Sequence, residues 1–134
     1  MLAQCKLDYS YFFRKLSDIH QPQVHTEIRN LCLDIAAFDD WYSQYQLALI
    51  IDGQPNSSEQ AQKRKQQMNQ VNPKYILRNY LAQNAISKAQ QGDYNEVKTL
   101  HKILSNPFDE HKEFEEYAQL PADWGKKIEI SCSS

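Results

Sequence analysis

The sequence predicts an all-α protein, a single compact helical domain of about five to six helices with an irregular C-terminal tail. Apolar residues recur at helical spacing along most of the chain, whereas the alternating pattern of β-strands is scarce. Only 3 glycines occur in 134 residues, so the sequence offers few of the tight turns that join strands. This length is close to the commonest size of one domain, and we expect residues 1–134 to form one unit.

The N-terminal half is expected to hold three helices that supply most of the core. Asp8 can cap the first helix, and Pro22 interrupts it. The buried face of this helix is expected to carry Phe12, Leu16 and Ile19. A second helix is expected over 24–33 and a third over 34–51. The third contains the longest aromatic stretch, and its broad buried face comprises Phe38, Trp41, Tyr42, Tyr45 and Leu49.

A loop at 52–58 divides the chain, because its Gly and Pro break the helical backbone and its serines can cap the next helix. The adjoining stretch, 59–69, is rich in Gln and Lys and offers only Ala61 and Met68 for burial. We therefore expect a mostly exposed helix there, with Lys63-Arg64-Lys65 on its solvated face.

Asn72 and Pro73 mark the next expected helix start, since Asn72 can accept hydrogen bonds from the first-turn amides and Pro73 suits the first helical position. Gly92 can end this helix in a left-handed conformation. Its expected buried stripe is Ile76, Leu77, Tyr80, Leu81, Ala85 and Ala89. Asp93 and Glu96 then form a variant of the capping box. The short helix after this box should bury Val97, Leu100, Ile103 and Leu104.

The remaining residues are less regular. We expect at least one helical turn within 108–120, with Phe114 and Tyr117 facing inward, and we expect Trp124 to anchor the tail. Residues 127–130 alternate between polar and apolar and are expected to be extended.

Charge and hydropathy exclude several classes of function. The chain carries 15 Lys and Arg against 17 Asp and Glu, a formal net charge of −2, so it has no basic surplus for binding nucleic acid. No apolar run approaches the ~20 residues that cross a membrane, and the N-terminus lacks the pattern of a secretory signal. We therefore expect a cytoplasmic protein that binds neither nucleic acid nor membrane.

The 3 cysteines indicate neither a disulfide framework nor a zinc site, because their number is odd and none shows CxxC spacing. Cys5 and Cys32 are expected to be ordinary buried residues. Cys132 differs, since it lies on a polar tail near the C-terminal carboxylate, where a thiol stays accessible to oxidants and disulfides. No metal site is predicted, because no metal-ligand spacing relates His20, His25, His101 and His111.

Several separated motifs of the second half resemble those of one known family. They are the run 68–83 around Asn72-Pro73-Lys74-Tyr75, then Asn106-Pro107-Phe108-Asp109-Glu110, Trp124-Gly125 and the terminal Ser131-Cys132-Ser133-Ser134. In order and approximate spacing they resemble the C-terminal end of the selenoprotein O family, the pseudokinase-fold protein adenylyltransferases also called YdiU-like proteins. Members of that family are several times longer, so we expect this chain to be the C-terminal region of a longer protein.

The resemblance implies an activity that belongs to the parent protein. A kinase-like core lying N-terminal to this region binds ATP with magnesium and transfers AMP to hydroxyl side chains of protein substrates. Such chemistry needs a phosphate-cradling loop and metal-binding carboxylates. This chain has no Gly-rich loop and no Asp-Phe-Gly or His-Arg-Asp triplet. We therefore expect no catalysis, cofactor or metal in this chain alone, and the kinase-like core and the parent's protein substrates as partners.

The resemblance also assigns a role to Cys132. The corresponding position holds selenocysteine in some family members and cysteine in others, and it is implied to form a regulatory disulfide with a Cys of the kinase-like core. The competing interpretation is an unconstrained tail thiol that oxidises adventitiously.

Two further alternatives stay open. Lys74, Arg78 and Asn79 are candidates for an interface with the kinase-like core, while capping alone explains Asn72 and Pro73. The chain as a whole has a second interpretation, a non-enzymatic helical protein-interaction module. A domain separated from its core should expose apolar surface or self-associate through it.

Overall fold

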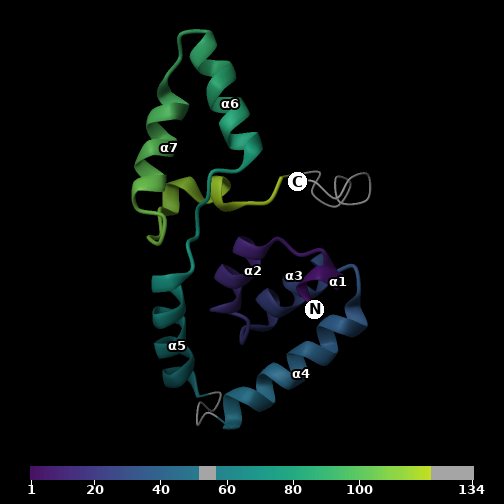
Figure 1. Ribbon diagram of the computed structural model, residues 1–134. Coiled ribbons are helices and arrows are strands. Elements are labelled where there is room, and N and C mark those ends of the chain that lie inside the picture. Colours follow the sequence, from purple (N-terminus) through teal and green to yellow (C-terminus); the bar gives the residue numbers. More distant parts are fainter. Residues whose placement is uncertain (52–56, 122–134) are drawn as a thin grey trace.

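The computed structural model describes residues 1–51 and 57–121, and the elements of these ranges are all helical, as predicted (Figure 1). They comprise seven α-helices and one 3-10 helix, more than we expected. The α-helices are α1 (Leu2–Cys5), α2 (Tyr9–Leu16), α3 (Pro22–Leu31), α4 (Ile35–Ile51), α5 (Ser58–Val71), α6 (Asn79–Gln90) and α7 (Asn95–Ser105), and the 3-10 helix is η1 (Lys112–Ala118). No described helix has the length and apolar character needed to cross a membrane.

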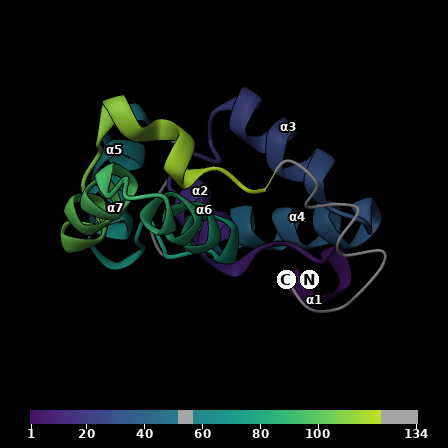
Figure 2. The ribbon, with the colours of Figure 1, turned by 90° about the horizontal axis from the view of Figure 1, so that it is seen from above.

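The helices form two groups. Short helices α1–α3 lie between the long helices α4 and α5, while α6 and α7 form an antiparallel hairpin that projects away from them (Figure 1). Seen from above, η1 runs from the side of α5 toward α2 (Figure 2). The segment between α5 and α6 connects the two groups.

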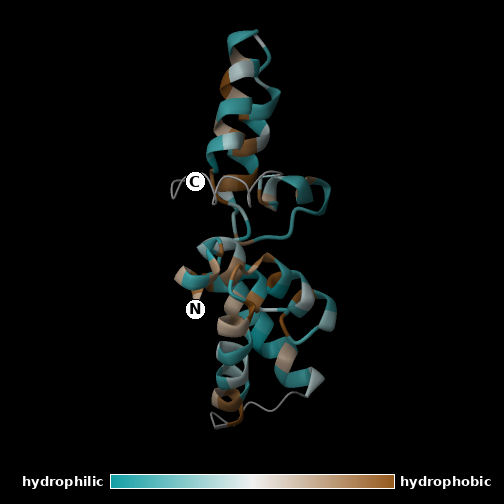
Figure 3. Cartoon of the chain, turned by 90° about the vertical axis from the view of Figure 1, so that its right-hand side faces the viewer, coloured by the Kyte–Doolittle hydropathy of each residue, from teal (hydrophilic) through white to brown (hydrophobic). Residues whose placement is uncertain are grey.

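The main core lies among α1 to α4. Its buried residues are Cys5, Tyr11, Phe12, Leu16, Ile19, Ile28, Cys32 and Phe38. Trp41 packs against Phe12 with ring centroids 5.3 Å apart and stacks on Tyr45 at the same distance. The predicted aromatic face of α4 is thus confirmed over its first three turns. The last turn of α4 exposes Leu47 and Ile50, which are 61% and 66% accessible, and Figure 3 shows the apolar residues at this end.

The α6–α7 hairpin has a smaller core made of Leu81, Ala85 and Leu100. Gly92 follows α6 with a φ of 88°, the left-handed conformation that its sequence position predicted. The predicted capping box of Asp93 and Glu96 is not formed: Tyr94 is the N-cap of α7 and has no side-chain cap bond. Asp93 instead accepts from the Asn95 N–H at 3.0 Å and donates its own N–H to the Lys88 carbonyl at 2.9 Å. Val97 was expected to be buried, but it is 44% exposed because this end of the hairpin has no neighbouring element to cover it.

The predicted helix start at Asn72 is wrong. Asn72 ends α5, donating its N–H to the Met68 carbonyl at 2.9 Å, and α6 begins only at Asn79. The residues between, 73–78, form an irregular connector in which Leu77 is 57% exposed. The backbone N–H groups of Lys74 and Tyr75 both donate to the Pro107 carbonyl, at 2.9 and 3.3 Å. These two amides of the connector therefore bond to a segment distant in the sequence and not to a carbonyl one helical turn earlier.

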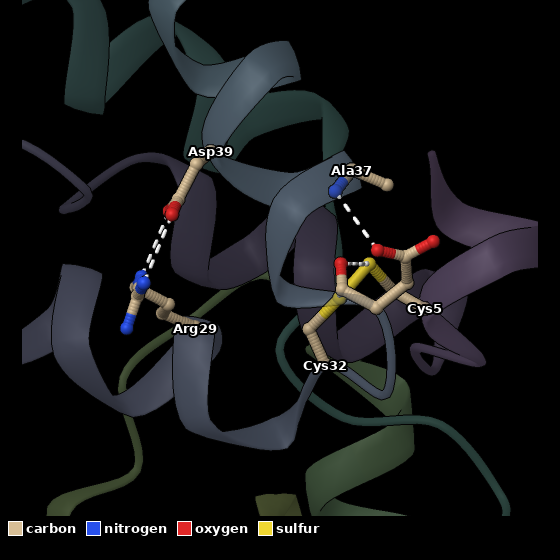
Figure 4. Close-up of a disulfide and its surroundings, with 6 residues drawn as sticks. Cys5, Arg29, Cys32, Ala37 and Asp39 are labelled. Atoms are coloured by element: carbon tan, nitrogen blue, oxygen red, sulfur yellow. Dashed lines mark hydrogen bonds and ion pairs between the residues drawn. A yellow bond between two sulfur atoms is a disulfide. The ribbon is translucent and has the colours of Figure 1, made fainter.

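The expectation that the cysteines form no disulfide is also wrong. Cys5 and Cys32 are bonded to each other, with Cα atoms 4.4 Å apart (Figure 4). The two cysteines are 27 residues apart in the sequence, and packing of α1 beside the end of α3 brings them together. Sequence spacing therefore gave no indication of the pair. Both remain buried core residues, as predicted.

Candidate functional site: a polar junction

Arg14 is the centre of a polar junction between the two helix groups. It lies on α2 and is 9% exposed. Its Nη1 donates to the carbonyl oxygens of Asn69 and Asn72, at 3.1 and 2.9 Å, and its Nη2 pairs with Glu110 at 3.1 Å. Arg14 thus satisfies carbonyls at the C-terminal end of α5, which have no partner within that helix, and it joins α2 to the segment that comes after α7.

Lys74 forms the second half of the junction. Its side chain is 11% exposed, and its Nζ forms ion pairs with both Glu110 and Glu115. Burial alone would lower the pKa of Lys74, but hydrogen bonds to the two carboxylates outweigh it, so the pKa is raised. Burial acts in the opposite direction on Glu110, where it alone would raise the pKa. Hydrogen bonds from Lys74 and Arg14 outweigh burial and hold the pKa of Glu110 below its usual value. Lys74 and Glu110 therefore stabilise each other in the ionised state.

A separate ion pair joins the N-terminal ends of α2 and α6. Arg78 donates to both carboxylate oxygens of Asp8, at 2.8 and 3.0 Å. Asp8 also caps α2, accepting from the Tyr11 N–H at 2.8 Å. Burial raises the pKa of Asp8, but hydrogen bonds from Arg78 and the Tyr11 amide reverse this effect and lower it.

Tyr75, a buried residue of the connector, binds the connector to the turn before η1. It is 2% exposed, and its hydroxyl donates to the His111 carbonyl at 3.1 Å while accepting from the His111 N–H at 3.3 Å. The two rings meet edge to face with centroids 5.4 Å apart. The connector and the turn before η1 therefore hold each other in place.

These residues border a cavity of about 450 Å³ between α2, α5 and η1. Its basic residues are Arg14, Lys15, Lys65, Lys74 and Lys112, and its acidic residues are Asp18, Glu110 and Glu115. Most charges are paired within the junction; Lys65, for example, lies 3.0 Å from Asp18. The lining keeps a positive excess, because five basic side chains face three acidic ones, and the ion pairs among them serve the structural junction.

Of the predicted site residues, Arg78 and Asn79 lie in the part of the chain that the structure describes. Arg78 was a candidate for contact with the kinase-like core, but its side chain is 10% exposed and pairs with Asp8 within the chain. Asn79 is exposed at the start of α6, and Cys132 lies outside the described residues. Among the described residues, no group of three or more His, Cys, Asp or Glu side chains is placed to hold a metal ion.

Sequence reasoning missed the roles of Arg14 and Glu110. Glu110 belongs to the motif 106–110 and Arg14 to the first predicted helix, and their opposite charges were the signal that could have suggested their pairing. Their separation of 96 residues left no spacing rule that relates them.

Comparison with known proteins decides the family. A family model described as protein adenylyltransferase SelO matches residues 1–105. The chain belongs to this family. The SelO relatives include the protein nucleotidyltransferase YdiU of Pseudomonas fluorescens SBW25, which is 52% identical over 134 residues, covering 100% of this chain and 27% of the relative. The YdiU of Vibrio vulnificus CMCP6 is 53% identical over 136 residues, covering 100% of this chain and 27% of that protein.

The chain therefore spans about a quarter of the length of these SelO-family relatives. The motif Asn72-Pro73-Lys74-Tyr75, on which the resemblance rested, forms the connector between the two helix groups. In this SelO-family chain the motif is bound by Arg14 from one side and by Pro107 and His111 from the other.

Proposed function

We infer that this chain is the helical C-terminal region of a protein adenylyltransferase and that it supports a kinase-like core. The observation that carries the inference is the coverage: identity of 52% extends over all of this chain but over 27% of the relative. The family motif 72–75 supports it too, because its residues hold an internal junction between the two helix groups.

In this proposal the parent protein transfers AMP from ATP, with magnesium, to hydroxyl groups of protein substrates in the cytoplasm. The kinase-like core performs the chemistry, and this chain performs none alone. Cys132 serves redox control by forming a disulfide with a Cys of that core. The partners are thus the core itself and, through it, the parent's protein substrates.

The exposed end of α4 favours a supporting role. Leu47 and Ile50 lie three residues apart, on one face of the helix, and both are more than half exposed. Burial of two such side chains is worth about 1.5–3 kcal/mol each, so a partner surface gains from covering them. In the proposal that partner is the kinase-like core; in the alternative, a non-enzymatic interaction module, it is another protein or a second copy.

A chimera tests the proposal. The matching segment of the Pseudomonas fluorescens YdiU is deleted, or replaced by this chain, and AMP transfer to protein and thermal stability are measured. We expect deletion to lower both and replacement to restore them. Full activity and stability after deletion would exclude the supporting role. Stoichiometric binding of ATP and magnesium to this chain alone, measured by calorimetry, would contradict the absence of an active site.

The role of the exposed α4 residues Leu47 and Ile50 is tested separately. Leu47→Ser with Ile50→Ser is introduced into the chimera and into the isolated chain. If α4 meets the core, the double variant lowers the stability of the chimera but not of the isolated chain. If the face joins copies of this chain, sedimentation velocity shows an oligomer that the double variant dissociates, and this outcome supports the interaction module.

A further inference from the structure

We propose that the Cys5–Cys32 disulfide is a redox-controlled latch that holds α1 against α4, and that its reduction releases α1 and uncovers Trp41. This proposal concerns a different pair of cysteines from Cys132; it rests on the cytoplasmic location proposed above and not on the adenylyltransferase activity. Stable disulfides are rare in reducing compartments, where those that form are commonly reversible and regulatory.

The other connections of α1 are noncovalent. It is a helix of four residues, too short to persist without tertiary contacts. Apart from the disulfide, a backbone bond joins it to the body, from the Leu33 N–H to the Cys5 carbonyl at 3.2 Å. Between α1 and α4 lies a cavity of about 300 Å³, lined by Met1 and Gln4 on one side and by Ala37, Asp40, Trp41 and Gln44 on the other. Met1 and Leu2 also pack against the main core, so the disulfide adds the covalent tie to contacts that can otherwise separate.

The neighbouring helices do not depend on the latch. Arg29 of α3 donates to both carboxylate oxygens of Asp39 on α4, at 2.8 and 2.9 Å (Figure 4). The Asp34 side chain separately caps α4 through the Ala37 N–H at 3.0 Å. Reduction therefore frees α1 without separating α3 from α4.

The site accommodates both redox states. The Asp34 carbonyl oxygen lies 3.4 Å from the sulfur of Cys5 and 3.1 Å from that of Cys32. After reduction, this oxygen can accept from a thiol, so a newly formed S–H does not remain buried without a partner. A local acceptor of this kind lowers the cost of the dithiol state.

The reaction is an ordinary thiol–disulfide exchange with a dithiol reductant. One thiolate of the reductant attacks the sulfur of Cys32, which is 6% exposed whereas Cys5 is 0% exposed. The S–S bond breaks, and Cys5 leaves as a thiolate that takes a proton. The second thiol of the reductant then displaces Cys32, which is protonated in turn. The reductant loses two electrons and becomes a cyclic disulfide, and the protein gains two thiols.

The test uses the Cys132→Ser, Trp124→Phe variant, in which Cys5 and Cys32 are the remaining thiols and Trp41 the remaining tryptophan. Alkylation in denaturant, followed by peptide mapping, should find no adduct in the oxidised protein and two after native treatment with a dithiol. Acrylamide quenching of Trp41 fluorescence should rise about twofold on reduction. Oxidised glutathione should restore both starting values after the dithiol is removed.

The matched control is the same variant with Cys5→Ser and Cys32→Ser, which should show the quenching of the reduced protein with or without dithiol. Two adducts in the air-oxidised protein would overturn the proposal, because the bond would be absent. A bond that resists the dithiol until the protein is denatured would make it a permanent staple. Equal quenching in the two redox states would show that α1 stays in place.

Discussion

Arg78 holds Asp8 through two hydrogen bonds, across 70 residues of sequence. The same carboxylate caps α2 through the Tyr11 amide. One side chain therefore sets the start of α2 and the position of α6 relative to it. The side chains of Asp8 and Arg78 are 14% and 10% exposed, so solvent screens this pair much less than an ion pair on the surface.

Removal of Asp8 should be costly. Asp8→Ala leaves the Arg78 charge buried without a partner and uncaps α2, and we expect a loss of about 3–5 kcal/mol in urea unfolding. Asp8→Asn retains the cap and should cost less. The control is Glu59→Ala, which removes an exposed pair with Lys63 at 3.8 Å and should change stability by less than about 0.5 kcal/mol. Equal losses for the three variants would refute a special role for Asp8.

The polar junction and the separate Asp8–Arg78 pair should both weaken in acid. The pKa values of Asp8 and Glu110 are lower in the folded protein than in the unfolded chain. Their stabilising contribution is therefore complete above the unfolded carboxyl pKa, about 4, and is lost as the pH falls below it. Urea unfolding at a series of pH values from about 6 to about 3 should show this loss. The Asp8→Asn variant should show a shallower decline, and a decline parallel to that of the unmodified chain would count against the mechanism.

Arg14 and Lys74 should act together, because both contact Glu110. A double-mutant cycle with Arg14→Met and Lys74→Met should give a coupling free energy of about 0.5–3 kcal/mol. The matched pair is Arg14→Met with Lys102→Met, since Lys102 meets Glu113 at 4.0 Å on the surface. That second cycle should be additive within about 0.5 kcal/mol. Additivity in both cycles would mean that Glu110 does not link the two cations.

Tyr75→Phe isolates the hydroxyl of a buried ring. The change removes the bonds to the carbonyl and amide of His111, and we expect a loss of about 1–3 kcal/mol in urea unfolding. Tyr94→Phe provides the comparison, because Tyr94 is 57% exposed and its change should be nearly neutral. A neutral Tyr75→Phe variant would contradict a stabilising role for these two hydrogen bonds.

Features that depend on neighbouring residues could be predicted from the sequence. Asp8 and Ser57 both accept from an amide three residues on, at 2.8 and 3.2 Å, and a cap of this kind needs only its own turn. Gly92 marks the end of α6 for the same reason. The helical fold and the aromatic face of α4 arise from periodicity, which is also a local property.

The junction could not be predicted in this way. Asn72 and Pro73 suit a helix start, yet Arg14, 58 residues away, occupies the Asn72 carbonyl and the connector stays irregular. Arg64 was expected on a solvated face but is 8% exposed, because α5 packs with this side toward the tyrosines of α4. In each case a contact distant in the sequence outweighs the local preference.

The shared Pro107 carbonyl has a consequence for how the chain folds. Pairing within the α6–α7 hairpin joins residues close in sequence, such as Lys88 and Glu96, 8 positions apart. The side-chain hydrogen bonds that attach the connector join residues 36 to 70 positions apart, so the polypeptide must close large loops before these bonds can form. We therefore expect the hairpin to assemble early and the junction to close in the rate-limiting step. Substitutions at Tyr75 or Arg14 should then reveal, by their effect on refolding rates, how much of that closure precedes the barrier.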